Sequence, residues 1–263
     1  MNHLLNEIDR RNETVQTKLT EHEGKTDDFY ANVDLSWIYH DNALEGVVLS
    51  FSELNAAIDD AIITDATLIP TYDAIRNHKA AITSVRHTKS KRKYPFDLDY
   101  LKKLHHILSH EELPRPIKAP PRPTPGQYRK DNPLHRMYFH EIAAPEKISY
   151  QMRKLVAWLG SDEAKKMPTV RRASMAHHRL ISIYPWPRHS GKVARLLMNA
   201  MLLRENYLPG IIHAIERQRY YEVLRQSPEA LTELVAESTL RTLKSAEQFF
   251  GIADPSEDGA NAS

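Results

Sequence analysis

The residues best suited to chemistry stand where a proline-containing loop leads into an apolar helix. Ser190, Gly191 and Lys192 follow the loop directly, and Arg195 lies one helical turn further on. The first turn of a helix has free N–H groups and carries the positive end of the helix dipole. Two basic side chains beside that end suit a phosphate or a carboxylate. An ordinary N-cap at Ser190 with solvated basic residues fits the same residues, so the spacing alone leaves both interpretations open.

The elements around this loop are predicted to be mainly helical. The chain has only eight glycines and long segments rich in Leu, Ala, Glu, Lys and Arg, a composition that favours helices. The segment 191–205 carries enough apolar residues to be expected at the centre of a bundle. Ser50 or Ser52 is expected to cap a helix that follows a helix end at Gly46. Helices are predicted at 50–58, 71–85, 97–109, 148–159, 169–183, 191–205 and 227–249.

Three other segments have distinctive compositions. The run 136–142 is the best β candidate and is predicted to form one arm of a short hairpin. The proline-rich run 114–126 is interpreted as a rigid surface connection, with a polyproline ligand as the alternative. The basic run 86–93 is interpreted as a solvated linker, with a nucleic-acid or acidic-partner patch as the alternative. Residues after Ala253 are expected to form a disordered tail.

The bulk properties exclude several classes of function. The chain has 263 residues, a formal net charge of +2 and no cysteine. Thiolate catalysis, disulfides and cysteine-based zinc sites are therefore excluded. The balanced charge gives no support for nucleic-acid binding. The first residues lack the apolar core of a signal peptide, and no run reaches the length of a membrane span. A cytoplasmic location is the expectation, although a secreted effector would have a similar sequence.

The loop resembles a known motif. Residues 184–195, Tyr-Pro-Trp-Pro-Arg-His-Ser-Gly-Lys-Val-Ala-Arg, resemble the Fic family loop, HPFx[DE]GN[GK]RxxR. The positions that fit are Pro185, Trp186, Gly191, Lys192 and Arg195. The resemblance covers roughly residues 34–250 and implies a Fic-type helical bundle with a small β-hairpin flap and an N-terminal helical extension. The implied division is an N-terminal helical region at 1–92, a Fic core at 93–250 and a tail at 251–263.

A second motif precedes the core. The run Asp41-Asn-Ala-Leu-Glu45-Gly46 is similar to the inhibitory helix of many Fic proteins, [ST]xxxE[GN], with Asp41 at the Ser or Thr position. In that family the glutamate enters the nucleotide site and pairs with the last arginine of the loop. The resemblance therefore implies that Glu45 restrains Arg195.

The family transfers AMP from ATP to a protein hydroxyl, and this chain departs from the motif at the positions that carry that chemistry. Tyr184 replaces the catalytic His, and its ordinary pKa of about 10 makes it a poor base near neutral pH. Arg188 replaces the carboxylate that binds magnesium and offers no oxygen ligand. His189 replaces a Gly whose positive φ shapes a nest of backbone N–H groups, so distortion of that nest is expected. Ser190 replaces an Asn.

Three hypotheses follow from these departures. The first is a degenerate Fic protein, inactive or strongly impaired in AMP transfer, that binds ATP or another nucleotide through Arg188, Ser190, Gly191, Lys192 and Arg195. The second is an active transferase with altered chemistry, in which Arg188 replaces the metal and His189 acts as the base. The third is a non-catalytic helical interaction module.

The resemblance also implies partners. A protein target, not specified by the sequence, would lie along a flap edge at Arg136, Met137, Tyr138 and Phe139. A homodimer is a further expectation, whereas a membrane or nucleic-acid partner is not. Neither a metal site nor a role for magnesium is expected, because Arg188 stands at the ligand position.

Overall fold

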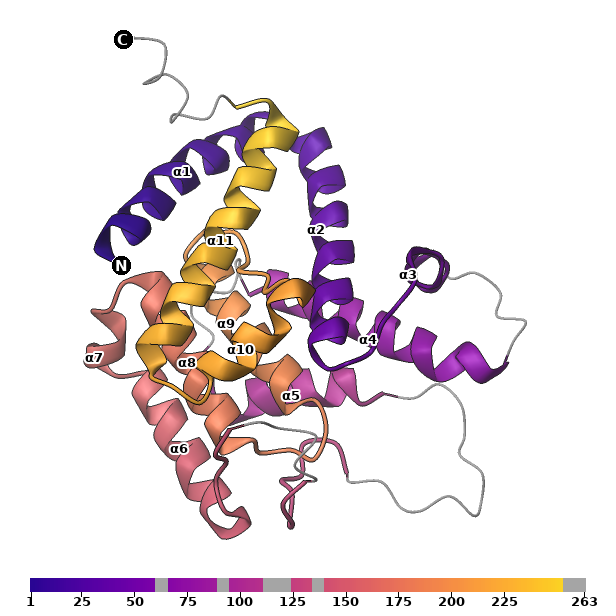
Figure 1. Ribbon diagram of the computed structural model, residues 1–263, viewed down its shortest axis with the longest axis vertical. Coiled ribbons are helices and arrows are strands. Elements are labelled where there is room, and N and C mark those ends of the chain that lie inside the picture. The colour runs from indigo at the N-terminus through magenta and orange to yellow at the C-terminus, as the bar shows by residue number, and fades with distance from the viewer. Residues whose placement is uncertain (60–65, 89–94, 111–123, 134–139, 253–263) are drawn as a thin grey trace.

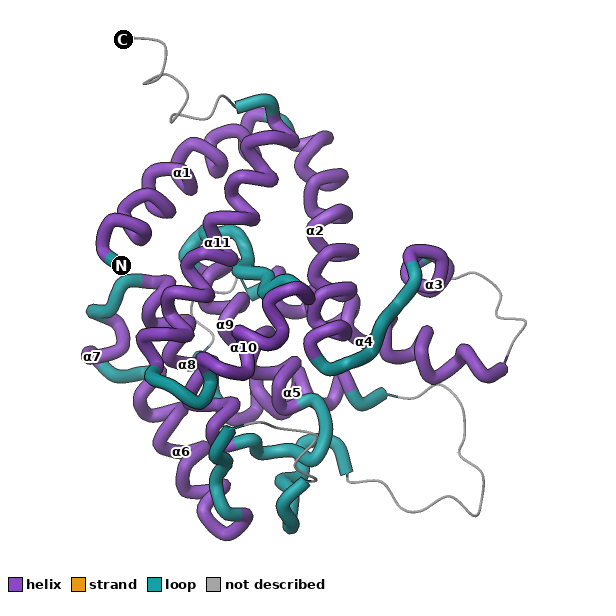
Figure 2. Tube along the Cα trace, in the orientation of Figure 1, coloured by secondary structure: helices purple, strands orange, loops and turns teal. Residues whose placement is uncertain are grey.

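The computed structural model describes residues 1–59, 66–88, 95–110, 124–133 and 140–252, and these residues form helices and loops (Figures 1 and 2). The N-terminal helices are α1 (Asn2–Glu21), α2 (Glu23–Leu44), α3 (Phe51–Ile58) and α4 (Ile69–Arg86). The middle of the chain forms α5 (Leu98–Leu108), α6 (Ile148–Leu159), α7 (Asp162–Lys165) and α8 (Thr169–Ile183). The C-terminal part forms α9 (Ser190–Arg204), α10 (Arg217–Val223) and α11 (Pro228–Phe250), with short 3-10 turns at Ala66–Leu68, Pro145–Lys147 and Ala214–Glu216.

Helix α9 is the centre of the bundle, as its apolar composition predicts. Every residue from Lys192 to Leu203 is buried. Helices α8, α4 and α5 pack directly against α9, and α6 and α11 pack against α8. Figure 1 shows α9 behind α10 and α11, with α4 and α5 on one side of it and α6 and α8 on the other. A helix this deeply buried presents only its first turn to a ligand, so the loop before α9 decides what that turn can bind.

The N-terminal helices share the hydrophobic core of the bundle. Helix α1 packs along α11, where the buried Arg11 donates to Glu7 at 2.9 Å and to Glu247 at 2.5 Å. Helix α2 runs from the far end of α11 toward the start of α9 (Figure 1). Its last turn therefore lies against the first turns of α9.

Several helix ends follow from local chemistry. Ser50 caps α3 in a capping box, in which its Oγ accepts from the Glu53 N–H at 3.2 Å and the Glu53 carboxylate accepts from the Ser50 N–H at 2.7 Å. Asp97 caps α5 and Ser227 caps α11. Each side chain accepts a hydrogen bond from a backbone N–H group in the first turn of its helix. Gly46 has a φ of 85° and follows the end of α2, as expected for a glycine terminator.

One prediction for the fold is not supported. No strand forms in the parts of the chain that the structure describes, so the β-hairpin flap is not supported. Arg136, Met137, Tyr138 and Phe139, the residues assigned to its edge, lie outside the described residues. His140 follows in an irregular segment and is buried, with Nε2 2.9 Å from the Ile181 carbonyl. This contact anchors His140 to α8 through its side chain, and no strand pairing is involved.

The proline-rich run up to residue 123, the end of the basic run from residue 89 and the tail from residue 253 also lie outside the described residues. Among the helices that are described, none is long and apolar enough to cross a bilayer.

Candidate functional site

The loop between α8 and α9 reverses the chain through two left-handed residues. Tyr184, which follows α8, has a φ of 49°, and His189, which precedes α9, has a φ of 63°. The expectation that the Cβ of His189 would distort this turn is wrong, because His189 adopts the positive φ that a glycine would provide. Histidine is among the residues that tolerate this region better than most. His189 therefore adopts a left-handed backbone conformation and adds an imidazole side chain to the turn.

Ser190 fixes the inside of the loop, but not as the predicted N-cap. The N-cap of α9 is His189, and Ser190 is the first helical residue. Its fully buried hydroxyl accepts from the Trp186 N–H at 2.9 Å and donates to the Trp186 carbonyl at 2.8 Å. One side chain therefore satisfies both backbone groups of a buried loop residue, and its oxygen is not available as a helix cap.

Trp186 anchors the loop in the hydrophobic core. The indole is fully buried and stacks on the ring of His105 from α5, with 4.7 Å between ring centroids. The Nδ1 atom of His105 accepts from the Gly126 N–H at 2.9 Å. Burial lowers the pKa of His105 to about 4, so that it is neutral at pH 7.

Arg129 holds the other side of the loop, a role that the sequence did not reveal. Its Nε donates to the Tyr184 carbonyl at 2.7 Å, its Nη2 donates to the Ala143 carbonyl, and its backbone N–H donates to the Pro185 carbonyl at 2.9 Å. The guanidinium fork suits several carbonyls at once. It therefore orients the backbone at the turn that follows α8.

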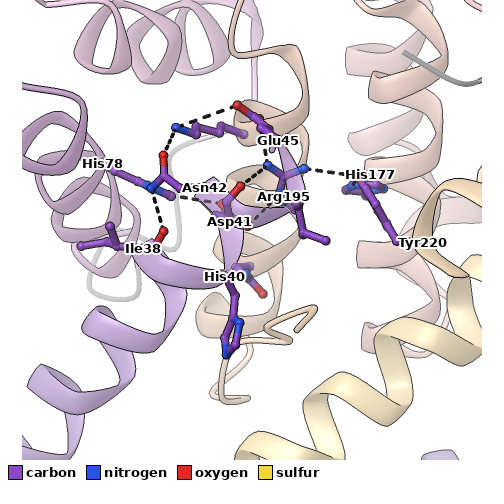
Figure 3. Close-up of polar contacts among 12 residues, drawn as sticks. Ile38, His40, Asp41, Asn42, Glu45, His78, His177, Arg195 and Tyr220 are labelled. Atoms are coloured by element: carbon purple, nitrogen blue, oxygen red, sulfur yellow. Dashed lines mark hydrogen bonds and ion pairs between the residues drawn. The ribbon is translucent and has the colours of Figure 1, made fainter. Parts of the chain in front are cut away.

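Two basic residues of α9 meet the last turn of α2 (Figure 3). The Nη2 atom of Arg195 lies 2.9 Å from Glu45 Oε1, and its Nε lies 2.7 Å from Asp41 Oδ1. Lys192 Nζ donates to Asn42 Oδ1 at 2.8 Å and lies 3.9 Å from Glu45 Oε2. Arg195 and Lys192 are buried. The cations that could bind a phosphate therefore already face carboxylate and amide oxygens of the same chain.

The third nitrogen of Arg195, Nη1, also has a partner. Nη1 donates to the Tyr220 hydroxyl at 3.3 Å, and the hydroxyl lies 3.1 Å from His177 Nε2. His177 is fully buried, so this histidine supports Arg195 from behind and does not approach the loop as a base. Figure 3 shows Tyr220 and His177 on the opposite side of Arg195 from Asp41.

Gly191 makes this close approach possible. A Cβ at this position would lie 3.1 Å from Arg195 Nη1 and 3.2 Å from Glu45 Oε1. These distances are tighter than ordinary packing allows, so a larger residue would push the ion pair apart.

The last turn of α2 is held from α10. The Leu44 carbonyl accepts from Arg217 Nε at 3.0 Å and from the Tyr221 hydroxyl at 2.8 Å. The last carbonyls of a helix lack partners within the helix, and these two side chains supply them. They fix the position of Glu45, which follows directly and is the C-cap of α2.

The charges around this turn set the protonation of the loop residues. Burial alone would raise the pKa of Glu45, but the charges of Lys192 and Arg195 lower it below its ordinary value. Burial, reinforced by the Glu45 charge, raises the pKa of Tyr184 far above its ordinary value. Burial and the charge of Lys192 lower the pKa of His189 to about 4. At pH 7, Glu45 is therefore an anion, whereas Tyr184 and His189 are neutral.

The structure brings together most of the residues predicted for the site. Tyr184, Ser190, Gly191, Lys192, Arg195 and Glu45 surround one helix end, and Gly46 follows Glu45 in the turn after α2. Arg188 lies in the same loop but is exposed. Asp41 and Asn42 supply further partners for the two cations, which the motif alone did not indicate.

Known proteins share sequence and fold with this chain. Residues 95–202 match the family model described as the Fic/DOC family. This segment of the chain is therefore similar to Fic/DOC domains. A solved Fic domain containing signaling protein from Bacteroides thetaiotaomicron is similar in fold, with a TM-score of 0.73, 19% identity and coverage of 93% of this chain and 99% of that chain. Fic-1 from C. elegans gives a TM-score of 0.73 at 20% identity, over 95% of this chain and 72% of that chain.

Relatives with curated names are Fic proteins of animals. The Protein adenylyltransferase Fic of Nematostella vectensis is 28% identical over 211 residues, which is 78% of this chain and 47% of that protein. The protein of the same name from Culex quinquefasciatus is 28% identical over 213 residues, covering 78% of this chain and 40% of that protein. The chain thus spans less than half the length of these relatives.

Proposed function

We propose that this Fic-family chain is a degenerate transferase, with an anion site at the start of α9 that its own Glu45 occupies. The observation that carries the proposal is the contact of 2.9 Å between Glu45 Oε1 and Arg195 Nη2. A carboxylate at a helix N-terminus, beside two cations, stands where a phosphate would gain the same interactions. Nucleotide binding in this state therefore requires Glu45 to withdraw.

The side chain of Glu45 is the part of this network that can move. It keeps 28% of its surface exposed, whereas the Arg195 side chain keeps 2%. If Glu45 withdraws, Lys192 and the free N–H groups of the first turn of α9 would hold the phosphates of ATP or another nucleotide. ATP would supply the AMP group in the relatives named as protein adenylyltransferases. By analogy, the acceptor for this chain would be a protein.

The proton acceptor of ordinary AMP transfer is missing. Tyr184 stands at the position of the family's histidine, is 6% exposed, and has a raised pKa. A neutral phenol with a pKa this high cannot accept a proton from an incoming hydroxyl. Loss of a general base costs about 10²–10⁴ in rate.

The residues at the loop do not fit a magnesium ion. Magnesium takes oxygen ligands in octahedral geometry, and Arg188 places an exposed guanidinium at the position where the family has a carboxylate. Lys192 adds a second positive charge nearby. No step of the proposed function therefore depends on a metal, and the absence of such a ligand further weakens AMP transfer.

Calorimetry and mass spectrometry test the proposal together. We expect Glu45→Gly to bind ATP at least about tenfold more tightly than the parent chain, because a competing charge is removed. Neither protein should acquire an AMP adduct when incubated with ATP and magnesium. The matched control is Glu205→Gly, which removes another C-cap glutamate paired with an arginine, at 3.0 Å from Arg172, and should leave ATP binding unchanged.

Two results would contradict the proposal. An AMP adduct on the parent chain or on Glu45→Gly would show that transfer is retained. Absence of ATP binding in every variant would leave a helical interaction module as the function.

A second candidate function is a transferase that uses His189 as its base. The observation in its favour is that His189 is neutral at pH 7, because its pKa is lowered to about 4. The same low pKa makes it a weak base. A nucleotide adduct that appears in Glu45→Gly and is lost in Glu45→Gly/His189→Ala would support this candidate over the first.

A further inference from the structure

Arg195 has two carboxylate partners that differ in how deeply they are buried. The Asp41 side chain keeps 4% of its surface exposed and meets Arg195 Nε at 2.7 Å. The Glu45 side chain keeps 28% exposed and meets Nη2 at 2.9 Å. Asp41 lies within α2, whereas Glu45 is the C-cap that follows it. The two carboxylates therefore cannot leave Arg195 with equal ease.

Asp41 is itself fixed from behind. Its Oδ2 lies 3.2 Å from Nε2 of His78, a fully buried residue of α4. The backbone carbonyl of Asp41 also accepts from Arg195 Nη2 at 3.5 Å. Moving Asp41 away would break contacts with both α4 and α9 and would leave the buried guanidinium with fewer partners, which is costly. Withdrawal of Glu45 breaks only contacts with α9.

The charges of the cluster explain why the difference between Asp41 and Glu45 matters for a bound ligand. Two carboxylates, Asp41 and Glu45, face two cations, Lys192 and Arg195, so the cluster is close to neutral while Glu45 is in place. Without Glu45, Asp41 still neutralises Arg195, and Tyr220 still occupies its Nη1. Of the two buried cations, Lys192 alone is then left to attract an anion.

We infer that Asp41 is a second and permanent restraint on Arg195, so that withdrawal of Glu45 frees Lys192 but leaves Arg195 bound. This inference rests on the proposed anion site and names Asp41 as the residue that limits the affinity of that site for a polyphosphate. The motif that the segment resembles has a Ser or Thr at this position, which would not neutralise an arginine. Asp41 thus gives this chain a restraint that the motif does not encode.

ATP binding tests the charge effect. Asp41→Asn keeps the shape of the side chain and removes its charge. We expect Asp41→Asn/Glu45→Gly to bind ATP at least about tenfold more tightly than Glu45→Gly, because one more positive charge faces the phosphates. The control is Asp34→Asn in the Glu45→Gly background, since Asp34 is also an α2 carboxylate paired with an arginine, Arg86. It should leave ATP affinity unchanged. Equal affinity of Glu45→Gly and the Asp41 double variant would overturn the inference.

A second measurement needs no ligand and no Asp41 variant. The Nε–H group of Arg195 can be followed by ¹⁵N NMR and assigned by its loss in Arg195→Lys. In Glu45→Gly we expect its proton to remain protected from solvent exchange, as in the parent chain, because Asp41 still accepts it. Rapid exchange of this proton in Glu45→Gly would overturn the inference. If no variant binds ATP, the proposed anion site fails, and this signal still decides the role of Asp41.

Discussion

Substitution of Ser190 by alanine should destabilise the fold through the loop alone. The hydroxyl makes two hydrogen bonds, both to the backbone of the fully buried Trp186. Alanine would leave that N–H and carbonyl without these partners. A buried polar group without a hydrogen bond costs about 1–3 kcal/mol, so we expect a loss of about 2–4 kcal/mol in the free energy of unfolding. For a chain of this size, this corresponds to a decrease of roughly 5–15 °C in Tm.

The chain offers a matched control for this experiment. Ser238 is also fully buried, but its hydroxyl makes one bond, at 2.8 Å to the Leu234 carbonyl within α11. That carbonyl keeps its helical bond when the hydroxyl is removed, so Ser238→Ala should cost less than about 1 kcal/mol. Urea unfolding followed by circular dichroism measures both variants. A cost for Ser190→Ala that equals the cost for Ser238→Ala would refute the role assigned to the loop hydroxyl.

Three further predictions concern the surroundings of the site. Arg217→Ala should increase hydrogen exchange at residues 42–47, measured by mass spectrometry, because the end of α2 loses a partner; unchanged exchange there would contradict this. In the folded state the pKa of His105 is lowered to about 4. Between pH 6.5 and 4 the unfolded state therefore binds more protons than the folded state, and the free energy of unfolding should fall as the pH falls through this window. His105→Gln should weaken this dependence of stability on pH, measured by urea unfolding at several pH values. The control His106→Gln, at an exposed neighbouring residue, should leave the dependence unchanged. Tyr184→His alone should give no AMP adduct by mass spectrometry, because the metal ligand remains absent; robust transfer would disprove the argument made for Arg188.

Most helices could be predicted because their signals are local. The apolar stripe of α5 and the capping residues Asp97 and Ser50 are all visible in the sequence. The loop motif marked the residues that meet at the start of α9, and the second motif marked Glu45, which contacts Arg195 there. These segments carry their own chemistry, so little depends on distant contacts.

The parts that could not be predicted depend on contacts between distant segments. Arg129 is 55 residues from the carbonyl of Tyr184 that it binds, and no pattern marks an arginine that will fold back on a loop. Asp41 looked like a variant of a Ser or Thr position, and its pairing with Arg195 appears only when α2 meets α9. His189 was expected to disturb the turn, but it adopts a φ of 63° at the junction of the loop and α9.

The most direct test is a crystal structure of Glu45→Gly grown with saturating ATP. We predict phosphate density beside the first turn of α9, within hydrogen-bonding distance of Lys192 Nζ, with Arg195 Nε still hydrogen-bonded to Asp41. ATP bound elsewhere, or an empty helix end at saturating ATP, would contradict the claim that Glu45 occupies an anion site.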